Sequence, residues 1–150
     1  MRAYVMIAAA LTSLAPLAPA QSTDPRISQI VSAPSARRLE ADDRKLVSFG
    51  TRHTMSDTLS ETRGIGAARR WIKSVFDSIS SACKGCLEVR YVADMVGPSQ
   101  RIPNATNVVS VVAIQRGTMD TGRVLIMTGH FDSRNSNGND AAGDAPGVQA

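Results

Sequence analysis

The 150-residue sequence has few aromatic residues and no block of like charge. It contains one Trp, two Tyr and three Phe, and its formal net charge of +4 comes from basic residues spread along the chain. Nucleic-acid-binding domains usually carry a clustered basic stripe interleaved with aromatic side chains. The composition therefore predicts no nucleic-acid partner, and the length allows one domain at most.

A long apolar run is also missing. The apolar segment Val5–Leu17 is too short to span a bilayer. It lies between the positive charge of Arg2 and the small residues Ala18-Pro19-Ala20, an arrangement typical of a cleaved secretory signal peptide. We therefore expect residues 1–20 to be a signal peptide. Residues 21–150 would then be secreted or periplasmic, with no membrane attachment after cleavage.

The sequence contains two cysteines, in the stretch Cys83-Lys84-Gly85-Cys86. A thioredoxin-like redox motif follows a strand and opens a helix, whereas this pair closes a predicted helix and precedes a predicted strand. A zinc knuckle would need a second cysteine pair. In an oxidising compartment the spacing favours a short structural disulfide.

The remaining pattern alternates between helical and extended spacing. Apolar periodicity predicts helices over Asp24–Val31, Ala36–Phe49 and Gly64–Ser81. Leu87–Val96 alternates and is typical of an edge strand, while the uniformly apolar Asn107–Ile114 is typical of a central strand covered on both faces. These elements predict an α/β fold.

The stretch Arg123–Arg134, which reads RVLIMTGHFDSR, carries the strongest functional signal. Val124–Met127 is long enough for a buried strand, and open α/β sheets place their chemistry at the carboxyl ends of strands. In an extended backbone His130 and Asp132 point to one side and Phe131 to the other. The carboxylate can then hold the imidazole as a zinc ligand. Taken alone, such a pattern also occurs by chance at solvent-facing positions.

Two more candidate ligands, Arg52 and His53, lie in the polar segment Thr51–Thr62. Arginine and histidine residues in loops mostly contact backbone groups or solvent, and this interpretation is favoured over a metal site.

Five short motifs occur in a fixed order. They are Ser48–Arg52 (SFGTR), Thr62–Ile72 (TRGIGAARRWI), Thr106–Val109 (TNVV), Gly129–Ser133 (GHFDS) and Asp144–Gly147 (DAPG). Together, from about Val47 to Gly147, they resemble the amino-terminal part of the secreted zinc peptidases of family M28, an aminopeptidase group with a two-zinc site. The resemblance implies a three-layer α/β/α fold with a mixed sheet and the hydrolysis of amino-terminal peptide bonds in peptides or proteins. It also implies that His130 binds zinc and that Asp132, as the catalytic-site carboxylate, orients it.

The sequence departs from this family where a second ligand is expected. In the family an aspartate that bridges the two zinc ions follows Ala-Pro-Gly within three residues, whereas here Ala145–Gly147 is followed by Val148, Gln149 and Ala150. Asp140 and Asp144 are poor substitutes, because loops rich in Asn, Gly and Asp are usually solvated. We therefore expect a truncated, inactive fragment with weak or no zinc binding. The alternative is a non-catalytic exported binding or decoy domain that retains the scaffold.

Overall fold

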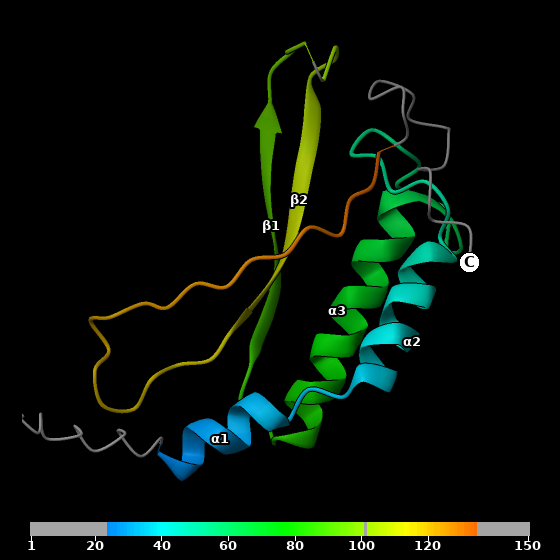
Figure 1. Cartoon of the computed structure of the whole chain (residues 1–150). Coiled ribbons are helices and arrows are strands. Elements are labelled where there is room, and N and C mark those ends of the chain that lie inside the picture. The colour runs from blue at the N-terminus through cyan, green and yellow to red at the C-terminus, as the bar shows by residue number, and fades with distance from the viewer. Residues whose placement is uncertain (1–23, 101, 135–150) are drawn as a thin grey trace, which may run out of the picture. The chain divides into compact units, whose positions relative to one another are not determined.

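A computed structural model describes residues 24–100 and 102–134 of the chain. In order, these form helices α1 (Pro25–Ser32), α2 (Ala36–Val47) and α3 (Gly64–Ala82) and strands β1 (Glu88–Val96) and β2 (Thr106–Ile114) (Figure 1). The predicted signal peptide lies outside the described residues. The chain divides into two units at Ser35 and Ala36, so α1 is described by itself. The combination of helices and strands confirms the predicted α/β class.

Helix α1 begins at a capping aspartate and agrees with the predicted helix within one residue. The Asp24 side chain accepts a hydrogen bond from the Arg26 amide at 2.9 Å. Pro25 occupies the first turn, where its missing amide donor costs nothing. No residue of α1 is buried.

Helix α2 ends two residues before the predicted end at Phe49. Gly50 adopts a φ of 64°, and its amide donates to the Val47 carbonyl at 2.9 Å. Such a left-handed glycine ends a helix because residues with a Cβ rarely adopt this conformation. Phe49 consequently leaves the helix and turns inward, where it is 4% exposed.

Helix α3 confirms the prediction of Gly64–Ser81 within one residue. Its first turns are the most deeply buried part of the chain that the structure describes, with Ile65, Ala67 and Ala68 at most 3% exposed. The helix also packs against both β1 and β2. No helix among the described residues is long and apolar enough to cross a membrane.

Strands β1 and β2 pair antiparallel over their full lengths, in a register that runs from Glu88 opposite Ile114 to Val96 opposite Thr106. Both predicted strands are confirmed within one residue. The prediction that the second strand is covered on both faces is wrong: none of its residues is buried. β1 is its one paired neighbour in the described part of the chain. The described sheet has two strands, so the three-layer fold with a mixed sheet stays a prediction.

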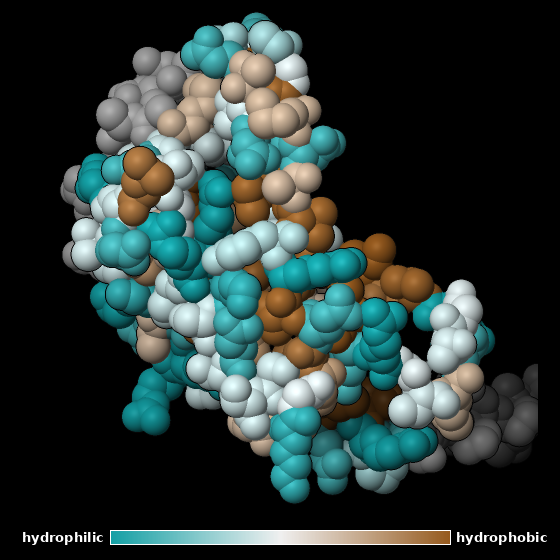
Figure 2. Space-filling model, turned by 180° about the vertical axis from the view of Figure 1, so that it is seen from behind, coloured by the Kyte–Doolittle hydropathy of each residue, from teal (hydrophilic) through white to brown (hydrophobic). Residues whose placement is uncertain are grey.

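The prediction of a buried strand at Val124–Met127 is also wrong. The segment has no regular secondary structure, and its four side chains are between 76% and 90% exposed. A strand needs a neighbour that pairs its amides and carbonyls, and apolar character alone does not supply one. Figure 2 shows apolar side chains reaching the molecular surface on the face it displays.

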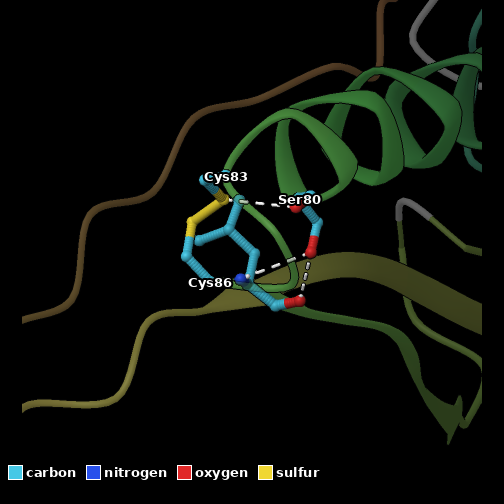
Figure 3. Close-up of a disulfide and its surroundings, with 4 residues drawn as sticks. Ser80, Cys83 and Cys86 are labelled. Carbon is cyan, nitrogen blue, oxygen red and sulfur yellow. Dashed lines mark hydrogen bonds between the residues drawn. A yellow bond between two sulfur atoms is a disulfide. The ribbon is translucent and has the colours of Figure 1, made fainter.

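The predicted disulfide is present between Cys83 and Cys86. It lies where α3 ends, and the neighbouring Ser80 joins the helix to the start of β1 (Figure 3). The Ser80 hydroxyl donates to the Leu87 carbonyl at 2.7 Å, and the Ser80 carbonyl accepts from the Gly85 amide at 2.7 Å. The disulfide thus closes a tight structural turn between helix and strand.

Candidate functional site

His130 and Asp132 lie side by side, as the sequence predicts. The Nδ1 atom of His130 is 2.8 Å from Oδ1 of Asp132. The His130 side chain is 95% exposed and that of Asp132 is 32% exposed. An ionised carboxylate can only accept a hydrogen bond, so in the neutral imidazole this contact puts the proton on Nδ1 and leaves the lone pair on Nε2. The exposed nitrogen is therefore the one that can bind a metal ion.

Phe131 anchors this pair from the opposite side of the backbone. Its side chain packs against a small core of Phe49, Ala67 and Ala68. Trp71 packs against the same core, with its ring centroid 6.1 Å from that of Phe49. The predicted alternation of His130 and Asp132 against Phe131 is thus confirmed, and the apolar contact fixes which face the polar pair occupies.

Two distant parts of the chain meet behind this pair. Arg52 Nε donates to the Phe131 carbonyl at 2.8 Å, and Arg52 Nη1 donates to the Leu46 carbonyl at 2.6 Å. The Arg52 amide donates to Ser133 Oγ at 2.9 Å, and the Ser133 amide donates to the Arg52 carbonyl at 3.1 Å. The prediction that Arg52 contacts backbone groups is confirmed, and two of its partners, Phe131 and Ser133, lie within the motif that carries the candidate ligands.

The electrostatic setting of Arg52 follows from its burial. The residue is 8% exposed, and this desolvation lowers the pKa of its guanidinium, while the carboxylates of Asp43 and Asp132 act in the opposite direction. Two backbone carbonyls receive its donors, so the buried cation is solvated by protein dipoles in place of water.

The glycines of the GIGAARRWI motif allow a loop to approach the start of α3. A Cβ on Gly64 would lie 2.4 Å from the Asp57 carbonyl oxygen, and a Cβ on Gly66 would lie 2.2 Å from that of Thr58. This close approach gives the first amides of the helix hydrogen-bond acceptors in the loop. Ile65 donates to Ser56 Oγ at 2.9 Å and Gly66 to the Asp57 carbonyl at 3.0 Å. The motif therefore has a structural role here.

We call the packed residues Phe49–Ser56, Gly64–Ala68 and Phe131–Ser133 the corner. His53, which lies within it, is 3% exposed. Its Nδ1 accepts a hydrogen bond from the Met55 amide at 3.1 Å. The prediction that His53 contacts the backbone is confirmed, and its burial separates it from the exposed His130.

His130 and Asp132 border a cleft of about 380 Å³. The cleft lies between the start of α3, the first half of β2 and the segment that bears His130 and Asp132. Its lining residues are Thr54, Ile65, Arg69, Val108–Ser110 and Thr128–Asp132. Burial lowers the pKa of the Arg69 guanidinium, and Tyr91 partly offsets that effect. The lining thus combines apolar side chains of α3 and β2 with polar ones, among them Arg69, His130 and Asp132.

The described residues contain no group of three or more His, Cys, Asp or Glu side chains placed to hold a metal ion. Asp140, Asp144 and the segment from Ala145 to Ala150 lie outside the described residues. His130 with Asp132 therefore fits one ligand of a zinc site, together with the group that orients it.

Comparison with known proteins finds relatives named probable zinc metalloprotease. The relative from Phaeosphaeria nodorum is 40% identical over 130 residues, which cover 85% of this chain and 26% of the relative. The relative from Leptosphaeria maculans is 42% identical over 122 residues, which cover 81% of this chain and 28% of the relative. The relative from Pyricularia oryzae is 37% identical over 129 residues, which cover 86% of this chain and 26% of the relative.

This chain therefore spans about a quarter of the length of the relatives it matches. Its similarity is to proteins named as zinc metalloproteases. No protein-family model matches the chain, and no solved structure matches it either.

Sequence reasoning missed the central place of Arg52 in the site. A charged residue in a polar segment is normally exposed, and nothing in the local pattern shows that the segment folds inward. The one hint in the sequence that Arg52 belongs to the site was its place in the motif Ser48–Arg52, which occurs together with the motif Gly129–Ser133 in the family that the chain resembles.

Proposed function

We propose that this chain supplies the first metal-binding edge of an exported zinc metallopeptidase of the M28 aminopeptidase type. In this proposal His130 binds zinc through Nε2, and Asp132 holds the imidazole in the tautomer that leaves this nitrogen available. The observation that carries the proposal is the 2.8 Å contact between the two side chains at the border of the cleft. Relatives named probable zinc metalloprotease support the metal and the reaction class.

The chemistry divides between the ion and the protein. Bound zinc would polarise the carbonyl of the scissile bond and acidify a water molecule. His130 would supply a neutral nitrogen donor, and Asp132 would raise its basicity by accepting the proton of Nδ1 in a hydrogen bond. The cleft beside them would hold part of a peptide or protein substrate, because its walls from β2 and α3 are mainly apolar.

The proposal places the other ligands in the parts of the longer relatives that this chain does not span. Catalytic zinc sites use three protein ligands and structural sites use four. With one imidazole, the 150-residue chain would leave most of the coordination sphere to water. We therefore expect this chain by itself to bind zinc weakly and to show no peptidase activity.

Export is part of the same proposal. The signal-peptide pattern of residues 1–20 directs the chain out of the cytoplasm. The disulfide between Cys83 and Cys86 supports this location, because such bonds persist mainly in oxidising compartments.

The test is a chimera in which residues 21–147 of this chain replace the corresponding segment of the Phaeosphaeria nodorum relative, so that the relative supplies every residue after the Ala-Pro-Gly motif. We expect the chimera to retain zinc and to release amino-terminal residues from peptides. The variant His130→Ala should lose zinc and activity together. The variant Asp132→Asn should keep most of the metal and turn over more slowly, because the amide orients the ring less well than the carboxylate.

Undiminished activity in both variants would overturn the assignment. A chimera that binds peptides equally well with and without zinc, and cleaves none of them, would favour the non-catalytic binding domain.

A further inference from the structure

We propose that Arg52 is a positioning residue of this site, which holds the segment His130–Asp132 so that the imidazole and the carboxylate face each other. The inference deepens the proposed function, on which it rests for the use of this geometry in metal binding. Its test includes a readout that needs no metal.

Arg52 binds a peptide group that lies between His130 and Asp132 in the chain. Phe131 lies between His130 and Asp132, and its carbonyl accepts a hydrogen bond from Arg52 Nε at 2.8 Å. That carbonyl belongs to the peptide bond that leads into Asp132, so its direction sets where the Asp132 carboxylate lies relative to the imidazole.

The second donor of the same side chain ties this peptide group to α2. Arg52 Nη1 donates to the carbonyl of Leu46 at 2.6 Å. Leu46 lies in the last turn of α2, where carbonyls lack partners within the helix and a positive charge is favourable. One rigid guanidinium thus bridges the end of a helix and the segment that bears the candidate ligands.

The backbone of Arg52 adds a second clamp one residue beyond Asp132. The Arg52 amide donates to Ser133 Oγ at 2.9 Å, and the Ser133 amide donates to the Arg52 carbonyl at 3.1 Å. The segment is therefore held at Phe131 and at Ser133. Asp132 lies between these two points and is left to orient His130.

Lysine cannot take over the side-chain role. An ammonium group is a single compact charge, whereas the planar guanidinium presents several donors in fixed directions to separate acceptors. Arg52→Lys should therefore keep the charge and lose one of the two carbonyl contacts.

Arg70 provides a matched control. It also donates to backbone carbonyls, those of Thr58, Leu59 and Ser60, and so ties a loop to α3. Its contacts involve neither Phe131 nor Ser133. Arg70→Lys should therefore weaken the fold in a comparable way without acting on His130.

The experiment uses the 150-residue chain labelled with ¹⁵N. Long-range correlation of the imidazole nitrogens gives the tautomer of His130 at a pH where the ring is neutral. Competition with a chromophoric chelator gives the zinc affinity of the same samples. We expect the Nδ1–H form in the wild type, a mixture of tautomers in Arg52→Lys with zinc affinity about tenfold lower or more, and wild-type values for both in Arg70→Lys.

A folded Arg52→Lys chain with the wild-type tautomer would overturn the inference. If that variant does not fold, Ser133→Ala decides the question, because it removes one bond of the backbone clamp and leaves the guanidinium in place. It should move the tautomer in the same direction, and an unchanged tautomer in this variant would overturn the inference. The two proposals can also be separated. If the tautomer of His130 depends on Arg52 but the zinc affinity does not depend on His130, the positioning role is supported and the proposed function is overturned.

Discussion

The corner and the segment Val124–Met127 differ in how side-chain polarity relates to burial. The corner includes Thr51, Arg52, His53 and Ser56, all polar and all at most 8% exposed. The four residues of Val124–Met127 are apolar, and each is at least 76% exposed. Burial in this chain therefore follows the availability of partners more closely than it follows side-chain polarity.

The difference has a physical cause. In the corner the buried polar groups have hydrogen-bond partners, either in the same segment, as His53 Nδ1 accepts from the Met55 amide, or in another, as Arg52 donates to the carbonyls of Leu46 and Phe131. Satisfied polar groups can be buried at little net cost. An apolar strand gains stability only when its backbone is paired and a second surface covers its side chains.

The largest expected effect comes from the aromatic residue at the centre of the corner. Phe49→Ala should lower the free energy of unfolding by about 3 kcal/mol, because it removes a ring from a core too small to collapse around the gap. Leu125→Ala removes a similar apolar side chain that is 90% exposed, and should change stability by less than about 0.5 kcal/mol. Urea unfolding of both variants measures the contrast, and equal losses would contradict the comparison.

A smaller loss is expected at the glycines that let the loop approach α3. Gly66→Ala should destabilise the chain by about 2 kcal/mol, because the new methyl group would lie 2.2 Å from the Thr58 carbonyl oxygen. This steric cost exceeds the gain of about 1 kcal/mol that alanine normally brings to a helix. Gly97→Ala is the control, since a Cβ there meets no atom within 4 Å. A more stable Gly66→Ala chain would show that the loop can move away.

The smallest expected effect on stability comes from the carboxylate of Asp57, in the loop that precedes α3. The Asp57 carboxylate accepts the amides of Leu59 and Ser60 at 2.7 and 2.9 Å. The Ser60 and Leu59 bonds lower the pKa of this carboxyl from its ordinary value of 3.8. A lowered folded-state pKa gives stability that is present above the unfolded value and is lost as the pH falls through the folded value.

Asp57→Asn should therefore be slightly less stable than the wild type at neutral pH, and this gap should close well below pH 3.8. Urea midpoints at several pH values measure it. If the difference in stability between wild type and Asp57→Asn grows as the pH falls, the assumed direction of the pH dependence is wrong.

The sequence was sufficient to predict the local elements. Helical periodicity predicts α3, alternation predicts β1 and a uniformly apolar run predicts β2, each within one residue of its bounds. The position of Cys83 and Cys86 between helix and strand predicts their disulfide. Period-two alternation also places His130 and Asp132 on one side of the backbone. Each of these depends on neighbours in the sequence, so a single sequence carries the information.

The features that could not be predicted depend on contacts between distant segments. The bonds from Arg52 to Phe131 and Ser133 span about eighty residues, and no local pattern shows that they form. For the same reason the apolar character of Val124–Met127 does not reveal whether a neighbouring strand is present.

The most direct test of the central claim is a zinc titration followed through the two histidines of the chain. His130 is exposed beside Asp132, whereas His53 is buried and its Nδ1 accepts the Met55 amide. We predict that zinc shifts the Nε2 resonance of His130, with weak affinity, and leaves the resonances of His53 in place. A zinc-dependent shift at His53 that is absent at His130 would contradict the assignment of His130 as the metal ligand.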